Sequence, residues 1–284
     1  MAYRDYIADT KTLALITQTV NAKNAVIPGV TVNAELAGLV QAQVAEFYYN
    51  LAPAVAEADA GADFNTSQAG SKKAVLPLTK ALHIDEKIPN AAVETTDADV
   101  LADRIVKGSL ALSNRMGAKF ISALETYGQS KEYTNGQNFY DAIVDGVATF
   151  SSGQSTRLGS VSDTSYSNKE NGVQPDTILV GDAGRAALLK TEQFQRITNA
   201  TGEMPNLIGN MFGLNVVYAQ DLTSEFALIN SENVAFPYAI NTLRVIDSEN
   251  FNGVRVQGEV AYSEPTEDLI PIDSHVMVFT EGVA

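Results

Sequence analysis

Two histidines, His83 and His275, are the only imidazoles in the chain, and the chain contains no cysteine. Imidazole and thiolate supply many of the nucleophiles, general bases and soft metal ligands of proteins. His83 lies in a lysine-bearing segment and His275 opens an apolar run, and neither has a catalytic partner nearby in sequence. We therefore interpret both as structural residues, and disulfides, thiolate metal sites and a cysteine nucleophile are excluded.

Two groups of acidic side chains have a spacing that could support catalysis or metal binding. One group flanks Pro265 and could supply paired carboxylates for glycoside hydrolysis; it consists of Glu264, Glu267 and Asp268. The other could hold a metal ion and consists of Asp97, Asp99 and Asp103. A solvated turn explains the first group better. The second opens a helix, where acidic side chains compensate the helix dipole, whereas calcium needs oxygens from a looped backbone.

Glycines after a predicted strand are the remaining candidate site. Gly181 and Gly184 stand between a strand and a helix, where a dinucleotide fingerprint would lie, but the three-glycine spacing is missing and Asp182 would repel a pyrophosphate. No G-x-S-x-G elbow and no phosphate-binding G-x-x-x-x-G-K-[ST] loop occurs. The sequence therefore predicts a protein that is not an enzyme, with no catalytic residue, no metal site and no cofactor.

Composition excludes further classes. The 284 residues are 45% hydrophobic and 19% charged, which suits a globular chain with a sizeable core. With 19 Lys+Arg and 34 Asp+Glu the net charge is −15, which makes the chain a poor candidate for wrapping nucleic acid through phosphate neutralisation. Residues 1–140 carry a net charge of −3 and residues 141–284 carry −12, which indicates different surroundings for the two halves. No apolar run is long enough to span a bilayer and no signal-peptide core opens the chain, so we expect a cytosolic origin.

The first ninety residues are predicted to form an arm, a helix and a ribbon. Residues 1–30 consist of short apolar pieces and are expected to be an extended arm, and residues 33–58 have apolar residues near the 3.6 period of a helix. Residues 60–72 are small and polar, as in a loop. Residues 72–89 are expected to be a two-stranded ribbon, which Pro77 and Pro89 confine to an edge or a free-standing hairpin.

That ribbon needs a partner, because an isolated hairpin is marginal in water. No partner strand is nearby in sequence, so we expect the apolar residues of the ribbon to pack on a neighbouring subunit instead of on the chain's own core. These residues are Val75, Leu76, Leu78, Ile84 and Ile88.

The strongest local prediction is a helix over Asp97–Tyr127. Threonines precede it, acidic residues crowd its first turns and basic residues come later, in the order that the helix dipole favours. One apolar stripe runs along it, made by Leu101, Ile105, Leu112, Met116, Phe120 and Leu124. Without a proline to interrupt it, such a helix would reach roughly 46 Å and act as a strut.

The rest of the chain reads as α/β. Phe139–Phe150 is an amphipathic helix whose inward residues are expected to be Ile143, Val144, Val147 and Phe150. A loop over 151–174 is followed by a strand at 177–181 and by a helix at 183–190 that Asp182 caps. Further strands are expected at 214–218, 226–230, 242–248, 253–262 and 275–279.

The order of these parts, from arm to mixed α/β domain, resembles the major capsid proteins of tailed bacteriophages, the Hong Kong 97 fold. Five stretches carry the resemblance over nearly the whole chain. The segment from Lys73 to Pro89 is similar to the family's extended loop, Asp97–Tyr127 to its spine helix, and the segment from Phe139 to Val147 to the next helix of its peripheral domain. Residues 175–190 are similar to the start of its axial domain, and residues 208–218 to a common turn-strand motif. At Tyr218-Ala219 the chain departs from that motif, because many members have a serine there.

The resemblance implies an α+β fold with six parts along the chain. They are an N-terminal arm and helix (1–59), an extended β-ribbon loop (60–92), a peripheral domain with the spine helix (93–174), a mixed α/β axial domain (175–245), return strands of the peripheral domain (246–265) and a C-terminal axial-domain strand (266–284). It implies a coat protein that assembles with itself as hexamers and pentamers into an icosahedral head shell around double-stranded DNA, with no membrane. A scaffolding protein, a portal and decoration proteins are the other implied partners, and the virion, assembled in the host cytoplasm, is the implied location.

Some members of that family cross-link a ribbon lysine to an asparagine of a neighbouring subunit. Candidate residues are present, namely Lys72, Lys73, Lys80, Lys87, Asn250 and Asn252, but the reaction also needs a desolvated glutamate that a sequence cannot place, so no site is assigned. Three other functions stay open at this point. They are an encapsulin-type bacterial compartment that encloses enzymes, an enzyme with an α/β domain, and a tail-tube or surface-layer protein.

Overall fold

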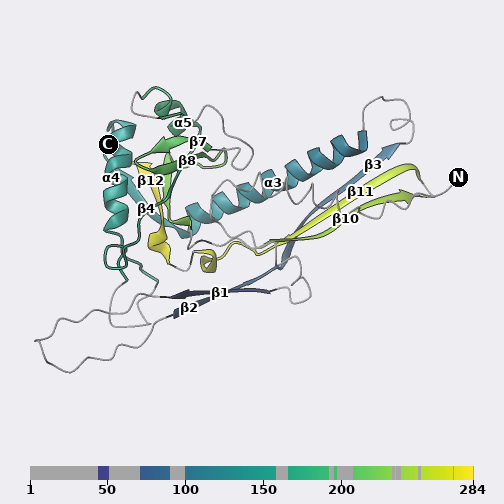
Figure 1. The fold of residues 1–284 in the computed structure, drawn as a ribbon, viewed down its shortest axis with the longest axis horizontal. Coiled ribbons are helices and arrows are strands. Elements are labelled where there is room, and N and C mark those ends of the chain that lie inside the picture. Colours follow the sequence, from purple (N-terminus) through teal and green to yellow (C-terminus); the bar gives the residue numbers. More distant parts are fainter. Residues whose placement is uncertain are drawn as a thin grey trace, which may run out of the picture.

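A seven-stranded mixed sheet with helices on both faces forms one end of the molecule, and a long helix with a narrow three-stranded sheet extends from it (Figure 1). The computed structural model describes residues 44–50, 71–89, 100–157, 166–191, 195–196, 207–231, 234, 238–248, 251–270 and 272–283. Within these residues the chain is α+β, as the sequence predicts.

The large sheet has the strand order β4-β12-β9-β5-β8-β7-β6. Its strands are β4 (Gln129–Tyr133), β5 (Thr177–Val180), β6 (Gln195–Arg196), β7 (Leu207–Met211), β8 (Leu214–Tyr218), β9 (Phe226–Ile229) and β12 (Val276–Glu281). β4 pairs in parallel with β12, and β5 with β8, whereas the other neighbours are antiparallel. The strands predicted at 177–181, 214–218, 226–230 and 275–279 are thereby confirmed within one or two residues.

Both faces of this sheet are covered, so its central strands are apolar on both sides. In β5, Leu179 belongs to the core beneath α3, while Ile178 and Val180 belong to the core beneath α4, as the alternation of a strand requires. Helix α3 (Val100–Tyr127) covers the first face with its C-terminal half. Helices α4 (Phe139–Ser151) and α5 (Asp182–Leu188) cover the second.

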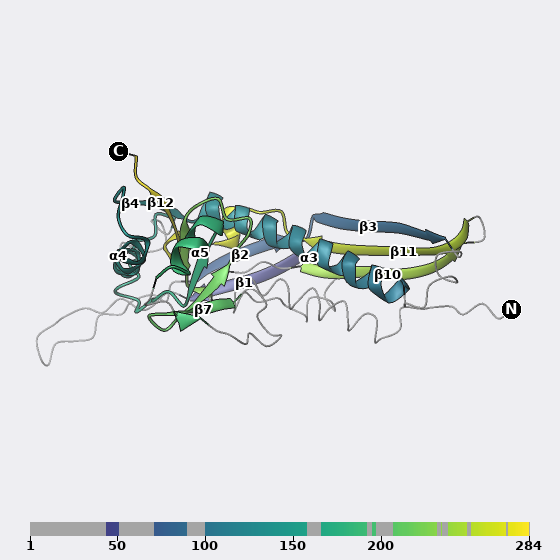
Figure 2. The same ribbon diagram turned by 90° about the horizontal axis from the view of Figure 1, so that it is seen from above.

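The long helix is confirmed over residues 100–127, and residues 97–99 lie outside the described residues. Its apolar stripe is buried against the sheet at Leu112, Met116, Phe120 and Leu124, none of which is more than 5% exposed. The N-terminal half of α3 leaves the large sheet and lies along β3 (Lys80–Pro89), β10 (Tyr238–Ser248) and β11 (Phe251–Tyr262) (Figures 1 and 2). We call this half-helix and the three strands the tongue.

The helix predicted over 33–58 is wrong where the structure describes it. Residues Val44–Asn50 form strand β1, which pairs antiparallel with β2 (Ser71–Pro77) in a two-stranded sheet. The segment VAEFYYN is rich in aromatic and β-branched residues, which favour a strand once a partner is available. The rest of 33–58, the arm 1–30 and most of the loop 60–72 lie outside the described residues.

The ribbon predicted over 72–89 is also wrong, because its two strands do not pair with each other. β2 pairs with β1, and β3 pairs with β11 over ten residues in the order β10-β11-β3. Pro77 and Pro89 do stand at strand ends, where a missing N–H is tolerated. The consequence for packing is large: Leu76 is fully buried in the α3 core, and Leu82 and Ile84 pack against that core.

Two smaller expectations need correction. The N-cap of α5 is Gly181, which makes no side-chain cap, and the Asp182 carboxylate instead accepts a hydrogen bond from the Tyr218 hydroxyl at 2.5 Å. Val144 is 41% exposed on α4, although it was expected to face inward with Ile143 and Phe150, which are buried.

Candidate assembly surfaces

The two histidines lie in different elements, His83 in strand β3 and His275 in a short 3-10 turn. His83 lies on β3 with a side chain that is 64% exposed, and its Nδ1 is 3.3 Å from the Glu259 carboxylate on the neighbouring strand. His275 precedes β12 and is 1% exposed. Its Nε2 lies 2.7 Å from the Tyr166 hydroxyl, and its Nδ1 has no hydrogen-bond partner.

A buried polar cluster surrounds His275. The Asp273 carboxylate accepts hydrogen bonds from the Gln129 amide (3.0 Å), the Ser155 hydroxyl (2.6 Å), and both the hydroxyl (2.6 Å) and the backbone N–H (3.1 Å) of Thr156. Burial alone would raise the pKa of Asp273, but these donors outweigh it and hold the pKa below its usual value. Burial also raises the pKa of Tyr166 to about 12. With its oxygens satisfied, Asp273 anchors the described parts of loop 151–174 to the base of β12.

We expect His275 to make the folded subunit acid-sensitive. Burial lowers the pKa of His275 to about 4, whereas an unfolded histidine titrates near 6.5. Below pH 6.5 His275 becomes protonated in the unfolded chain, whereas in the folded chain it stays neutral down to about pH 4. The free energy of unfolding therefore decreases as the pH falls from 6.5 to 4. Between pH 7 and pH 5 the loss is about 2 kcal/mol.

Chemical denaturation of the subunit at pH 7 and pH 5 measures this loss. His275→Gln should flatten the dependence in this window, and His83→Gln, at an exposed position, should leave it unchanged. Equal stability of the wild-type subunit at the two pH values would contradict the burial of a neutral His275.

The carboxylate groups form no site. Glu264 lies 3.6 Å from Lys80, and Glu267 and Asp268 belong to a short 3-10 turn, η3 (Glu267–Leu269). Asp103 makes an ion pair with Lys107 one turn later on α3, while Asp97 and Asp99 lie outside the described residues. Among the residues that the structure describes, no cluster of His, Asp or Glu could hold a metal ion, and no helix is long and apolar enough to cross a bilayer.

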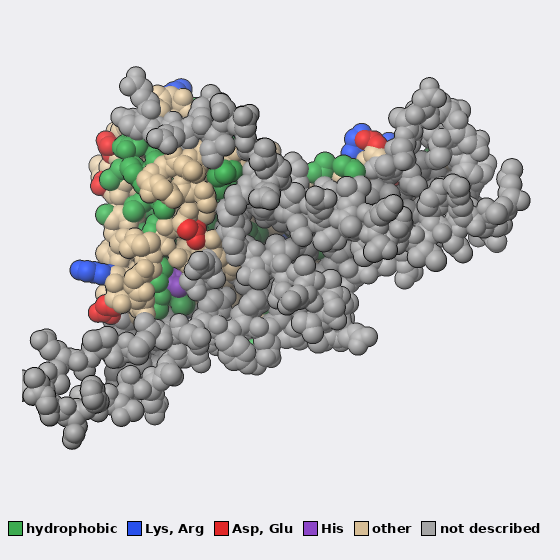
Figure 3. Space-filling model, in the orientation of Figure 1, with side chains coloured by type: hydrophobic (Ala, Val, Ile, Leu, Met, Phe, Trp, Pro, Cys, Tyr) green, Lys and Arg blue, Asp and Glu red, His purple; other side chains and the backbone are tan. Residues whose placement is uncertain are grey.

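Two exposed surfaces of the described chain could meet other molecules. In the space-filling view, hydrophobic side chains gather over α4 at one end of the molecule (Figure 3). The tongue offers a second kind of surface, because its two faces differ in chemistry. Leu82, Ile84 and Val260 turn toward α3 and its core, whereas the alternate residues of β3 and β11 turn away from it.

The outer face of the tongue is a set of cross-strand polar pairs. Register places His83 opposite Glu259, Asp85 opposite Gln257, and Lys87 opposite Arg255. The expectation that the apolar residues of 72–89 would pack on a neighbouring subunit fails for Leu76, Leu78 and Ile84, which pack within the chain.

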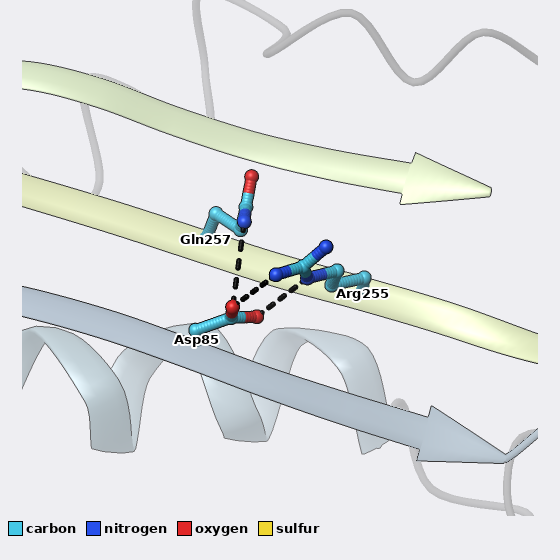
Figure 4. A network of polar contacts seen from close by, with 3 residues as sticks. All are labelled: Asp85, Arg255 and Gln257. Carbon is cyan, nitrogen blue, oxygen red and sulfur yellow. Dashed lines mark hydrogen bonds and ion pairs between the residues drawn. The ribbon is translucent and has the colours of Figure 1, made fainter. Parts of the chain in front are cut away.

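The Asp85–Arg255 pair holds this face together (Figure 4). The Arg255 Nε donates to Asp85 Oδ1 at 2.6 Å, and its Nη2 contacts Oδ2, a bidentate geometry that also brings Gln257 alongside. The Arg255 guanidinium lowers the pKa of the Asp85 carboxyl to about 2. Because the pair is exposed it adds little to stability, but it specifies the register between strands that are 170 residues apart in sequence.

Two contacts fix α3 on the inner face of the tongue. Arg104 makes an ion pair with Glu86 at 3.0 Å, and Gly108 leaves just enough room for Ile84, whose Cδ1 would lie 3.2 Å from a Cβ at that position. The tongue is thus a helix-on-sheet unit with one open polar face. Among the described residues, both β3 and β10 are edge strands of its sheet. The sequence carried no signal for this unit, because its strand partners are far apart along the chain.

No family model matches the chain, and no curated protein matches it in sequence. Solved structures match it in fold. A chain in a structure of Mycobacterium phage Che8 superposes with a TM-score of 0.57 and 15% identity over 87% of this chain and 88% of that chain. A chain in the capsid structure of the cyanophage P-SCSP1u gives 0.52 and 11% over 85% and 84%. A chain in the capsid of a native GTA particle gives 0.53 and 13% over 86% of both chains.

The chain has a phage capsid fold. Identities of 11–15% show the fold alone, so the use of its surfaces has to be argued from their geometry. The phage capsid fold accounts for the elongated arrangement, in which a sheet domain with two covered faces carries a projecting tongue (Figure 2).

Proposed function

We propose that this chain is the major capsid protein of a tailed phage, a coat subunit that assembles with itself into the icosahedral head shell around the phage genome. The observation that carries the proposal is the extent of the structural match. Capsid chains from a cyanophage and a GTA particle share the fold over 84–86% of their own length as well as over 85–86% of this chain. The likeness is therefore not confined to one common module such as the sheet.

The tongue supports the proposal on physical grounds. A projecting sheet with two edge strands presents unpaired backbone groups, which are a liability for a monomer but a ready contact for a neighbour. A shell subunit must repeat a heterologous contact until it closes. One face of the tongue packs on α3, and its other face is polar and open. The tongue is therefore suited to form one side of such a contact.

The finer roles follow as parts of the same proposal. Residues 1–59 serve as the N-terminal arm and α3 as the spine helix of a peripheral domain, and β3 forms part of the tongue instead of a separate extended loop over 60–92. Partners are copies of the chain in hexamers and pentamers, a scaffolding protein, a portal and decoration proteins. A net charge of −15 suits a shell around double-stranded DNA that is packaged without sequence-specific binding. The neighbours reported above are particles of phages and a GTA, which lends no support to an enzyme compartment.

Electron microscopy and light scattering of the protein expressed with its scaffolding partner test the proposal. We expect closed, isometric particles of very high mass that contain the full chain. Open tubes or flat sheets would favour a tail-tube or surface-layer protein, and a species that stays monomeric under every assembly condition would refute a coat function.

A further inference from the structure

The turn between β7 and β8 holds a bulky residue in a conformation that such residues avoid. Phe212 and Gly213 join the two strands as a two-residue turn, and their φ angles are +55° and +80°. A type I′ hairpin turn needs positive φ at both positions, and asparagine, aspartate or glycine normally fills the first one. Among the described residues Phe212 is the only non-glycine residue with positive φ. A bulky residue there is a conformational outlier, and such outliers point to a function.

Packing within the chain explains only part of this choice of residue, because Phe212 is 49% exposed. Its ring lies 5.3 Å from the ring of Tyr140 on α4, and Val144, one turn further along α4, is 41% exposed. We call Phe212, Tyr140 and Val144 the apolar patch. Two exposed acidic residues of α4 follow the patch residues directly in sequence: Asp141 follows Tyr140, and Asp145 follows Val144.

A groove that is lined by small residues and by a basic residue lies at the other end of β8. It has a volume of about 400 Å³ and lies between the middle of α3 and the turn that follows β8. Small residues of α3, Ala111, Gly117 and Ala118, line one wall together with Arg115, and Tyr218 lies across from them. Asp221 also lines the groove. Lys119 follows Arg115 by one turn on α3, and neither cation has an acidic partner among the described residues.

One copy of the chain cannot bring the patch into its own groove. Phe212 precedes the first residue of β8 and the groove begins at its last residue, Tyr218, so the two are about 20 Å apart along an extended strand. The patch also lies on the α4 side of the sheet, whereas α3 covers the other side. Two complementary surfaces placed this way on one molecule make a head-to-tail contact between copies.

We propose that Phe212 of one copy inserts into the groove between α3 and β8 of the next copy, with Asp141 and Asp145 facing Arg115 and Lys119 across the contact. The inference rests on the proposed coat function and names one lateral contact of the shell. The strained turn holds the ring of Phe212 out of the sheet, and the small residues of α3 leave room for it. The charge pairs set the direction of the contact and make it sensitive to salt.

Phe212→Asn separates this role from folding. Asparagine suits the turn better than phenylalanine, so the melting temperature of the unassembled subunit should stay the same or rise. The yield of shells, measured by sedimentation and electron microscopy after expression with the scaffolding partner, should fall at least tenfold. Leu189→Asn is the matched control, since Leu189 is 41% exposed and lies outside the patch, and its shells should form normally.

A charge swap identifies the partner surface. Asp145→Lys and Arg115→Glu should each reduce the yield of shells, and the combined variant should recover most of it, because every copy then carries both changed surfaces. Normal shells from Phe212→Asn, an equal loss with Leu189→Asn, or no recovery in the combined variant would each overturn the inference while wild-type shells still form. Failure of the wild-type chain to form shells in the same experiment would instead refute the coat function.

Discussion

Replacing residues 73–88 with a short Gly/Ser linker should prevent the subunit from folding. The sequence suggested the opposite outcome, a stable subunit that cannot assemble, because no partner for this segment was visible. In the structure Leu76 is 0% exposed in the core that α3 forms with the large sheet, and β3 pairs with β11 along its whole length. Loss of both removes part of the core and leaves β11 without one neighbour. The net free energy of unfolding of a domain is only about 5–15 kcal/mol, so we expect the loss of this part of the core and of a paired strand to unfold the subunit.

Two point variants test the same claim without a deletion. Leu76→Ala should lower the free energy of unfolding by about 2–5 kcal/mol, since it opens a cavity in the core. Val75→Ala is the matched control, because its side chain is 41% exposed, and should cost well under about 1 kcal/mol. Urea denaturation followed by circular dichroism measures both. If the linker variant melts like the wild-type subunit, or if the two alanine variants are equally stable, residues 73–88 do not belong to the core.

Leu112→Pro should unfold the subunit and not merely stop assembly. Leu112 lies in the middle of α3 and is 4% exposed against the large sheet. Proline removes a helix hydrogen bond and clashes with the preceding turn, which costs about 3 kcal/mol or more. Loss of the leucine side chain from the core adds about 2–5 kcal/mol. Because α3 belongs to both the sheet domain and the tongue, both parts lose their support together.

Neighbouring variants separate the two costs of that substitution. Ala111→Pro breaks the helix at an exposed position, so it should cost about 3 kcal/mol without opening a cavity. Leu112→Ala keeps the helix and should show the cavity cost alone. The expected order of destabilisation, read from denaturation curves, places Leu112→Pro well beyond either. A Leu112→Pro subunit with wild-type helicity and melting would show that α3 does not span this position.

The elements that the sequence predicted correctly are those with local signals. Helix α3 is marked by an uninterrupted apolar stripe and by charges ordered for its dipole, and β5 is a short apolar run that ends in glycine. The order of these elements along the chain indicated the capsid fold, and the structural neighbours confirm this fold. The helix at Phe139–Phe150 was marked as clearly, although Val144 is 41% exposed and does not face inward as the apolar stripe indicated.

The larger errors concern which strand pairs with which. Residues 44–50 have aromatic residues that fit a helical period as well as a strand, and only pairing with 71–77 decides between them. The partner of β3 comes 170 residues later, beyond any local pattern. Phe212 gave no signal either, because an exposed phenylalanine is ordinary in a sequence and becomes informative only with its positive φ angle. Long-range pairing and backbone strain are properties of the folded chain.

A cryo-electron microscopy reconstruction of particles formed by this chain tests the central claim most directly. We predict a closed icosahedral shell whose repeating density fits the described fold, with the sheet domain and the tongue of each copy in contact with neighbouring copies. Tubes, flat sheets or a discrete small oligomer would contradict a coat function. A shell in which the tongue contacts no neighbour would contradict the role given to it here.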